Sequence, residues 1–354
     1  MPISIPNADC CRYAVIVPQE LGRELESAAV AKSADRLALS VVVPCFNEEA
    51  VVCELYRRVT TSCRDLVGGS YELVLVNDGS TDRTWALMQS LASEDECVIA
   101  IDLSRNHGHQ LALSAGLSLA RGARILVIDA DLQDPPELLA DMMRLMDDGA
   151  DVVYGQRIGR DGETWFKRTT ASTFYRLLLH MTDVRIPADT GDFRLMKRQV
   201  LDALLAMPEH QRFIRGMVAW VGFHQVPLKY RRDRRFAGTT KYPLRKMLTF
   251  AVDAITGFST VPLRASLYLA FVFLVFAAFL VIFVLFSWMY LGAVPGWTSI
   301  FLGMLIFSSV QLFSLAIIGE YLGRVYMQTK QRPLFIIREI VISPNEPHKR
   351  CHNR

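Results

Sequence analysis

The sequence lacks the features that identify several common classes of protein. Its 7 cysteines in 354 residues show no metal-site spacing, and we expect them to be free thiols. The first residues contain no basic segment followed by an apolar one, so we predict no secretory signal. The net charge of +3 is small and indicates little about partners.

Two nucleotide-binding motifs are absent as well. No G-x-G-x-x-G follows the first predicted strand, which leaves a Rossmann dinucleotide site unsupported. No G-x-x-x-x-G-K-[ST] occurs in the chain, which excludes a P-loop. The sequence contains no module typical of nucleic-acid binding, so we expect no nucleic-acid partner.

Charged residues are missing from one long part of the chain, between Arg264 and Glu320. Within it, residues 266–290 and 297–319 are each long enough to cross a bilayer as a helix, and Gly292 and Pro295 lie in the turn between them. We predict a transmembrane hairpin within residues 265–320. A buried hairpin in a soluble core is the weaker interpretation, because such helices seldom lack charge over this length.

Basic residues flank this apolar part on both sides. Lys and Arg collect on the cytoplasmic side of membrane spans, so we predict an inner (plasma) membrane protein with both flanking parts in the cytoplasm. Residues 242–264 have an amphipathic pattern that is typical of helices in the membrane interface, or equally of helices packed on the preceding domain. We treat residues 1–38 as an extension and residues 321–354 as a cytoplasmic tail.

Residues 39–241 alternate between strand and helix patterns. Predicted strands cover residues 39–43, 71–76, 97–102, 125–128 and 151–154, and helical patterns separate them. This alternation predicts an α/β fold with a mostly parallel, doubly wound sheet. We expect residues 165–230 to be more helical and less regular.

The strongest candidate site follows the strand at residues 125–128. Asp129, Asp131 and Gln133 come directly after it, where ligands collect in α/β sheets. Their oxygens are the ligands that Mg²⁺ or Mn²⁺ prefers. Asp134 and Glu137 are typical of a helix start, with Asp134 as the N-cap. A strand ending in solvated acids would explain one Asp but not the whole group.

Further polar loops follow other predicted strands, at residues 43–49, 77–82 and 155–157. Acids gathered at one sheet edge repel one another unless a cation or a hydrogen-bonding ligand lies between them. A nucleobase can take an Asp acceptor, a ribose can take Asn and Glu groups, and a diphosphate needs a metal.

These motifs resemble those of family-2 glycosyltransferases with the GT-A fold. The resemblance covers residues 39–340 and is carried by Val-Pro-Cys-Phe-Asn-Glu-Glu, Val-Asn-Asp-Gly-Ser-Thr-Asp, Asp-Ala-Asp-Leu-Gln-Asp-Pro-Pro-Glu and Gly-Asp-Phe-Arg-Leu-Met. It is strongest to membrane-anchored polyprenyl-phosphate glycosyltransferases, namely bacterial undecaprenyl-phosphate glucosyltransferases and dolichol-phosphate mannose synthases. Residues 1–38 lie outside it.

The resemblance implies roles for individual residues. Asp192 matches the proposed catalytic base, and Asp129, Asp131 and Gln133 would hold Mg²⁺ or Mn²⁺. The residues implied for the nucleotide-sugar are Pro44, Asn47, Glu48, Asp78, Asp129 and Arg157. The cations implied for diphosphate or lipid phosphate are Arg235 and Lys241.

Several of these residues have simpler interpretations. Asp78 could cap the helix that begins near Ser80, and Arg157 could be a surface cation. Arg235 and Lys241 could bind anionic lipid alone. Asp189 competes with Asp192 for the catalytic role.

Two nearby histidines, His107 and His109, look like polar residues at a helix start with a minor chance of touching the nucleotide.

The implied reaction is a direct, inverting displacement in which a polyprenyl phosphate attacks a nucleotide-sugar, most readily UDP-glucose. The acceptor phosphate has a second pKa of about 6 and is mostly dianionic at neutral pH, so we expect Asp192 mainly to orient groups. GDP-mannose or a UDP-amino-sugar would use the same scaffold. A homotetramer is implied by resemblance alone.

Two other functions are weaker. A processive polysaccharide synthase would carry Gln-x-x-Arg-Trp, and the segment from Gln211 to Arg215 misses that spacing. A non-enzymatic membrane scaffold is disfavoured because the acidic motif residues are all present.

Overall fold

The computed structural model describes residues 37–158, 190–232, 261–291 and 296–343. They fall into two compact units. The sheet domain comprises residues 37–158, 190–232 and 332–343, and the helical unit comprises residues 261–291 and 296–331. The predicted extension, except its last two residues, and residues 242–260 of the predicted interfacial helices lie outside the described residues.

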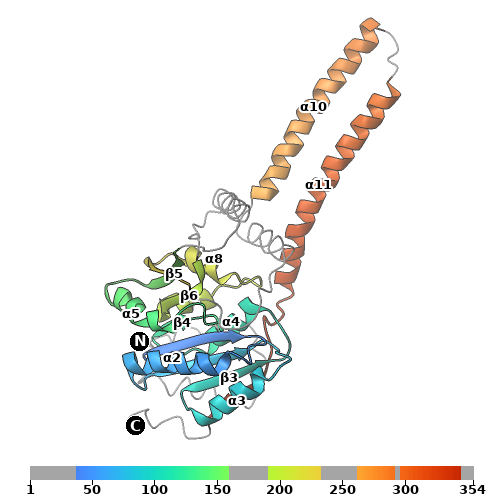
Figure 1. Cartoon of the computed structure of the whole chain (residues 1–354). Coiled ribbons are helices and arrows are strands. Elements are labelled where there is room, and N and C mark those ends of the chain that lie inside the picture. The colour runs from blue at the N-terminus through green and yellow to red at the C-terminus, as the bar shows by residue number, and fades with distance from the viewer. Residues whose placement is uncertain (1–36, 159–189, 233–260, 292–295, 344–354) are drawn as a thin grey trace, which may run out of the picture. The chain divides into compact units, whose positions relative to one another are not determined.

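Eight strands form one sheet in the order β7-β5-β6-β4-β1-β2-β3-β8 (Figure 1). Their bounds are β1 Leu39–Cys45, β2 Tyr71–Asn77, β3 Val98–Leu103, β4 Arg124–Val127, β5 Val152–Arg157, β6 Thr190–Lys197, β7 Gln225–Tyr230 and β8 Ile337–Ile342. Strand β1 pairs in parallel with β2 and β4, as do β2 with β3 and β5 with β7, whereas the pairs β3–β8, β4–β6 and β5–β6 are antiparallel. The predicted mostly parallel α/β sheet is confirmed.

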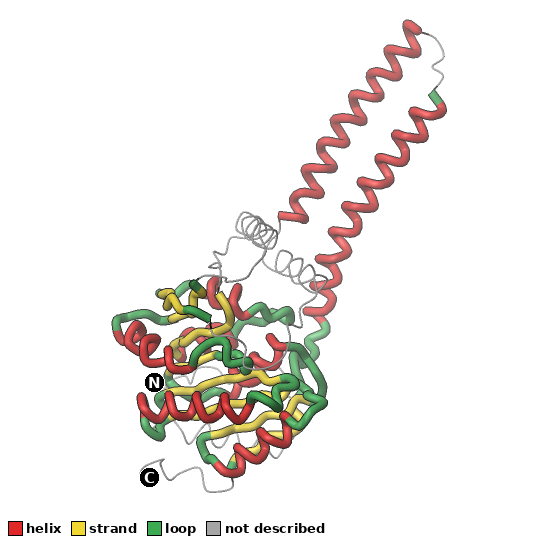
Figure 2. Tube along the Cα trace, in the orientation of Figure 1, coloured by secondary structure: helices red, strands yellow, loops and turns green. Residues whose placement is uncertain are grey.

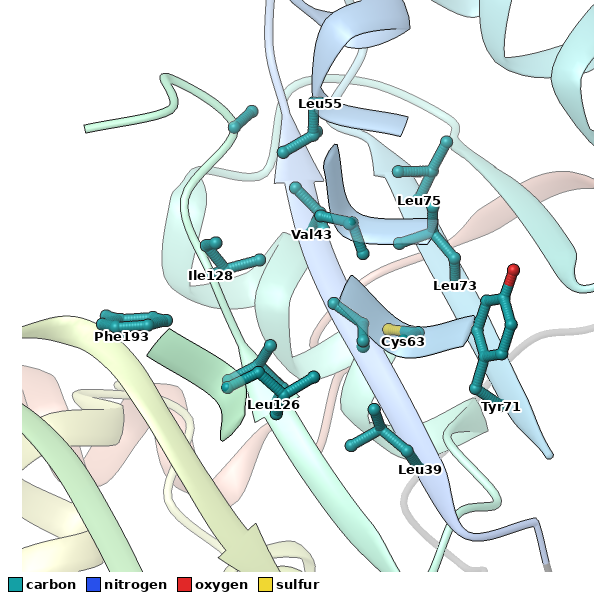
Figure 3. Packing of buried hydrophobic residues seen from close by; sticks show 14 of the residues in the cluster. Leu39, Val43, Leu55, Cys63, Tyr71, Leu73, Leu75, Leu126, Ile128 and Phe193 are labelled. Atoms are coloured by element: carbon teal, nitrogen blue, oxygen red, sulfur yellow. The ribbon is translucent and has the colours of Figure 1, made fainter. Parts of the chain in front are cut away.

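Helices cover both faces of this sheet. Their bounds are α2 Val52–Val67, α3 Thr84–Glu94, α4 His109–Leu119, the short 3₁₀ helix η2 Pro136–Leu138, α5 Leu139–Asp147, α7 Arg198–Leu205 and α8 Ile214–Val221. The main core lies between the sheet and α2, α3 and α5. Figure 3 shows Leu55 and Cys63 of α2 against Val43 and Leu73 of the strands. All seven residues of β1 are buried, as expected for a strand covered on both faces.

Helix α4 packs unusually close to the opposite face of the sheet. A Cβ atom on its residue Gly116 would lie 2.4 Å from Cγ1 of Val42 and 2.8 Å from Cγ2 of Val76. A side chain at this position would therefore push the helix away from β1 and β2. The close packing fixes the start of α4, which carries residues of the candidate site.

The region from residue 190 to 230 contains more strand than predicted. Strand β6 lies between β4 and β5, and its residues from Gly191 to Met196 are buried. Two of them, Asp192 and Arg194, are charged, which hid the strand pattern in the sequence. The predicted tail also contributes a strand, because β8 returns to the sheet and pairs with β3.

The helical unit contains α10 (Val261–Leu291) and α11 (Trp297–Thr329), which run side by side (Figure 2). The ring centroids of Phe273 and Phe307 are 5.7 Å apart across this pair. Among the described residues, one segment, Ile306–Thr329, is long and apolar enough to cross a membrane. The two-span hairpin therefore stays a prediction.

Candidate active site

Asp129 and Asp192 face each other because of the register between two strands. Strand β4 pairs with the antiparallel strand β6, and Val127 lies opposite Arg194. Two residues further along β4 and two residues back along β6 lead to Asp129 and Asp192. An antiparallel pair keeps such positions opposite one another. The structure thus brings together two predicted site residues from distant parts of the sequence.

The carboxylate of Asp129 has an oxygen that no other group satisfies. Its Oδ1 atom is buried and has no hydrogen-bond partner among the described residues, although Nε2 of His109 lies 3.5 Å away. Burial raises the pKa of Asp129, the His109 charge opposes that rise, and the neighbouring carboxylate of Asp192 adds to it. The protonated ring of His109 approaches this oxygen only to 3.5 Å, and a bound metal cation would be a closer partner.

Two overlapping sets of groups could supply metal ligands around Asp129. The side chains of His109, Asp129 and Asp192 each offer one ligand atom, and these atoms lie within 4.8 Å of one another. The predicted set shares Asp129 but adds Asp131, whose Oδ1 accepts a hydrogen bond from the backbone of Gln133 at 3.2 Å. The buried oxygen and the hard oxygen donors fit Mg²⁺ or Mn²⁺.

Asp192 is the centre of a dense hydrogen-bond network. Its carboxylate is 1% exposed and accepts bonds from Arg215 of α8, from Nε to Oδ1 at 2.7 Å and from Nη2 to Oδ2 at 3.1 Å. Gln110 donates to Oδ2 at 3.1 Å, and the His109 ring nitrogen Nε2 lies 3.0 Å from the same oxygen. The first two residues of α4, His109 and Gln110, therefore both contact the carboxylate of Asp192.

The charges in this network favour an ionised Asp192. Burial opposes ionisation, but the guanidinium of Arg215 and the ring of His109 hold the pKa of Asp192 well below its usual range. Burial also lowers the pKa of His109, yet its bond to Asp192 and the charges of Asp129 and Asp192 raise it to about 9. Asp192 is thus a fixed anion that orders its neighbours.

Asp78 is held by the loop that precedes α4. Its buried carboxylate accepts hydrogen bonds from the backbone amides of His107 at 2.7 Å and Gly108 at 3.0 Å. Burial raises the pKa of Asp78, and these two amides oppose the rise. The interpretation of Asp78 as a cap near Ser80 is wrong, since its carboxylate oxygens face the other loop.

The loops after β1 and β2 are bound to each other. The backbone amide of Asn47 donates to Oγ of Ser80 at 2.9 Å, and Oδ1 of Asn47 accepts from the amide of Thr81 at 2.8 Å. The amide of Glu48 donates to Oγ1 of Thr84 at 2.8 Å. Pro44, near the end of β1, pairs with Val76 of β2. The structure therefore gathers Pro44, Asn47, Glu48 and Asp78 at one edge of the sheet.

Gly79 lets the loop after β2 approach the loop after β3. Its φ is +66°, and a Cβ atom would lie 2.6 Å from the backbone nitrogen of Asn106 and 2.7 Å from the carbonyl carbon of Arg105. We expect Gly79→Ala to lower the free energy of unfolding by about 1–2 kcal/mol more than Gly68→Ala, measured by urea denaturation.

Gly68 is the matched control for that prediction. It has a similar φ of +59° but open space around its Cβ position. Both variants carry the left-handed backbone strain, and only Gly79→Ala forces backbone atoms apart. Equal losses in the two variants would show that the loops do not meet as closely as described.

Asp134 is not a helix cap. The 3₁₀ helix has Pro135 at its N-cap position with no capping side chain, and Asp134 is instead fully buried and accepts a hydrogen bond from the hydroxyl of Tyr230. Two guanidinium groups lie beside it, with Arg157 Nη2 at 3.6 Å and Arg232 Nε at 3.7 Å from its oxygens. Burial is too costly for an unpaired carboxylate, which explains this arrangement.

Arg157 is more than a surface cation. Its side chain is 24% exposed, and a Cβ atom on Gly191 would lie 2.5 Å from its Nη2 atom. It therefore lies against the residue next to Asp192. Burial lowers the pKa of Arg157, but Asp134, Tyr230 and Asp129 together outweigh that effect, and the net shift is upward.

Some predicted residues lie outside the described residues, namely Arg235, Lys241 and Asp189. Others were missed from the sequence: Gln110, Arg215 and Arg232 were assigned no site role, and His109 was expected at a helix start or near the nucleotide but not beside the two acids. His109 does begin α4, but its side chain reaches both acids. The sequence offers no signal for Arg215, because its partner Asp192 lies on a strand that was not predicted.

Comparison with known proteins identifies the family. The model of glycosyl transferase family 2 matches residues 40–205. The uncharacterized glycosyltransferase YkcC of Bacillus subtilis (strain 168) is 47% identical over 85% of this chain and 93% of its own length. The chain belongs to glycosyl transferase family 2.

One further relative and one solved structure are also similar to this chain. The prophage bactoprenol glucosyl transferase homolog of Escherichia coli (strain K12) is 37% identical over 86% of this chain and 99% of its own length. Among solved structures, mannosyltransferase PcManGT from Pyrobaculum calidifontis, in complex with GDP-Man and Mn²⁺, has 16% identity and a TM-score of 0.42, over 85% of this chain and 94% of that one. The protein is therefore a family-2 glycosyltransferase whose site lies on a mostly parallel α/β sheet.

Proposed function

We propose that this glycosyltransferase moves glucose from UDP-glucose to a polyprenyl phosphate at the cytoplasmic face of the membrane, with inversion at the anomeric carbon. The observation that carries the proposal is the close approach of Asp129 and Asp192, whose side-chain ligand atoms lie within 4.8 Å of each other. Relatives named bactoprenol glucosyl transferase, at 35–37% identity over most of the chain, support the lipid acceptor and the glucose donor.

The donor binds, in this proposal, at the sheet edge formed by β1, β2 and β4. Asp78 accepts a hydrogen bond from the base, and Pro44, Asn47 and Glu48 line the pocket. Asp129, Asp131 and Gln133 would hold Mg²⁺ or Mn²⁺, which would supply positive charge to offset the negative charge on the leaving diphosphate. The buried, unsatisfied Oδ1 of Asp129 supports this assignment.

Cations beside the proposed metal ligands serve the phosphates, and Nη2 of Arg232 lies 3.8 Å from Oδ2 of Asp131. Arg157 and Arg232 flank the buried Asp134, which holds two positive groups near the acidic edge without a tight hydrogen bond to either. Arg235 and Lys241 complete this group on the strength of the motif resemblance. Their role is to bind the diphosphate and to attract the acceptor phosphate into the site. Their positive charge offsets the repulsion between that phosphate and the carboxylates of Asp129 and Asp192.

Asp192 acts as a positioning anion in this mechanism. The acceptor phosphate has a second pKa of about 6, so it is mostly dianionic near neutral pH and needs no base. The bonds from Arg215, Gln110 and His109 already occupy the Asp192 carboxylate. Asp192 therefore fixes these three side chains, and the nucleophile is the phosphate oxygen itself.

The sheet itself supports the proposed membrane topology. Strands β1 to β7 precede the apolar part of the chain and β8 follows it, and all of them belong to one sheet. The parts of the chain before and after the apolar part must therefore lie on the same side of the membrane. An even number of crossings satisfies this condition, and the predicted spans at residues 266–290 and 297–319 supply two. The homotetramer implied by resemblance is part of the proposal and is tested by light scattering in detergent.

A panel of labelled donors tests the choice of sugar. Purified protein receives Mg²⁺ or Mn²⁺, undecaprenyl phosphate, and UDP-glucose, GDP-mannose or a UDP-amino-sugar. We expect UDP-glucose to label the lipid fastest. Faster labelling from another donor would contradict the glucose assignment while leaving the lipid acceptor in place.

A further inference from the structure

The chain returns to the sheet domain after the helical unit, and this return reaches the candidate donor pocket. Strand β8 pairs antiparallel with β3, with Ala100 opposite Val341 and Asp102 opposite Glu339. We propose that Arg338, on β8, is a positioning residue for nucleotide binding. This inference rests on the proposed role of the Asp78 loop as the donor pocket.

A first chain of hydrogen bonds runs from Arg338 to the loop after β2. Nη1 of Arg338 donates to Oδ2 of Asp102 at 3.0 Å, although the two residues are 236 positions apart. Oδ1 of Asp102 accepts from Nδ2 of Asn77 at 2.7 Å. Oδ1 of Asn77 in turn accepts from the backbone amide of Ser80 at 3.2 Å. Because the Asn77 amide must donate to Asp102, its oxygen is directed at the loop that contains Asp78.

A second connection runs through the loop between β3 and α4. Nη2 of Arg338 donates to the carbonyl oxygen of Ser104 at 2.6 Å, and the amide of Ser104 donates to the carbonyl oxygen of Ile336 at 2.9 Å. Ser104 begins the loop whose His107 and Gly108 amides hold Asp78. Hydrogen bonds therefore connect Arg338 and its neighbours to both loops around Asp78. One is the loop after β2, and the other is the loop between β3 and α4.

Arg338 is suitable for a substitution test because its own side chain is exposed while its partner Asp102 is buried. Its side chain is 62% exposed, whereas Asp102 is 2% exposed. Strand β8 is anchored by the buried side chains of Phe335 and Ile337, so replacing Arg338 leaves the core unchanged. The change instead leaves the buried charge of Asp102 with one partner fewer, and Asn77 loses the group that fixes its orientation.

The experiment measures nucleotide binding and kinetics in the full chain, reconstituted in lipid nanodiscs with Mn²⁺. UDP and GDP are titrated calorimetrically into wild type, Arg338→Gln, Arg338→Lys and the matched control Glu339→Gln, whose exposed side chain is the next along β8. We expect Arg338→Gln to weaken binding of the nucleoside diphosphate about 5–20-fold, a usual size for coupling between groups that do not touch the same ligand.

A purely structural role would give a different set of kinetic changes. We expect Arg338→Gln to raise the donor KM by the same factor as the dissociation constant, with kcat and the KM for undecaprenyl phosphate unchanged. Arg338→Lys restores part of the affinity because it keeps the charge. Glu339→Gln behaves as wild type. A fall in kcat together with a matching fall in melting temperature would overturn the positioning role.

An Asp78→Ala variant separates this inference from the proposed function beneath it. If Asp78→Ala weakens binding of UDP or GDP and Arg338→Gln does not, the β8 inference fails and the donor pocket stands. If wild type binds neither nucleotide, or Asp78→Ala binds as wild type does, the proposed pocket fails and the inference falls with it.

Discussion

Asp129→Asn is expected to abolish sugar transfer and at the same time to raise the melting temperature of the metal-free protein. The loss of activity follows from the removal of a proposed metal ligand and is expected to lower kcat at least about 10³-fold. The gain in stability follows from burial, which raises the pKa of Asp129 and leaves its Oδ1 without a hydrogen-bond partner among the described residues.

The sign of the stability change depends on pH in a defined way. The folded-state pKa of Asp129 lies above its unfolded value, so the carboxylate costs no stability below the unfolded pKa. The cost begins as the pH rises through the unfolded pKa and is complete above the folded pKa, so it is already present at neutral pH. The neutral Asn side chain removes this cost.

Calorimetry with and without Mn²⁺ measures both effects. In metal-free buffer at pH 7 we expect Asp129→Asn to melt about 2–4 °C above wild type, the shift that about 1 kcal/mol gives in a domain of this size. Added Mn²⁺ raises the melting temperature of wild type and leaves that of the variant unchanged. A variant that melts below wild type without metal would contradict the description of Asp129 as an unsatisfied carboxylate.

Asp192→Asn is expected to reduce kcat by about 10²–10⁴-fold without selective loss of the low-pH limb of the pH–rate profile. Its carboxylate is held well below its usual pKa by Arg215 and His109, so it does not titrate between pH 5 and 9. An anion that only orders its neighbours scales the rate at every pH. Loss of the low-pH limb alone would instead identify Asp192 as a true general base.

The same variant is expected to be less stable. Replacing one partner of a buried ion pair leaves Arg215 without its anion and costs on the order of 3 kcal/mol. Because the folded pKa of Asp192 is depressed, its contribution is complete at neutral pH and is lost as the pH falls through the folded pKa. Urea denaturation at pH 7 and pH 3 measures this difference, which shrinks at the lower pH.

Arg215→Lys separates the catalytic effect from the loss of stability. It keeps a positive charge beside Asp192 but cannot make the two-fold contact from Nε and Nη2. We expect its melting temperature to lie between those of wild type and Asp192→Asn, with kcat reduced about 10-fold or more. A Lys variant with wild-type kcat would show that the orientation of this guanidinium is irrelevant to transfer.

The central strands and the acidic motif could be predicted from the sequence because each is defined by a pattern of neighbouring residues. The apolar run before Asp129 marks a buried strand, and the Asp129, Asp131 and Gln133 pattern follows it directly. The role of Asp134 was not readable, because a cap and a buried carboxylate have the same sequence pattern. Only the fold brings Tyr230 and two Arg side chains to it.

Contacts between distant parts of the chain account for the rest. Strand β6 contains buried charges that pair with residues from other elements, so its sequence lacks the apolar pattern of a strand. The pairing of His109 with Asp129 depends on the close packing of α4 on β1 and β2. Strand β8 meets β3 across more than 200 residues of sequence, and a short apolar segment near the end of the chain does not reveal such a partner.

The most direct test of the proposed function is the transfer of labelled glucose from UDP-glucose to undecaprenyl phosphate by the purified full chain in nanodiscs with Mn²⁺. We expect label in the lipid phase only when undecaprenyl phosphate is present, and none with Asp129→Asn. If the lipid stays unlabelled with every nucleotide-sugar in the panel, the protein does not use a polyprenyl phosphate acceptor and the proposed function is wrong.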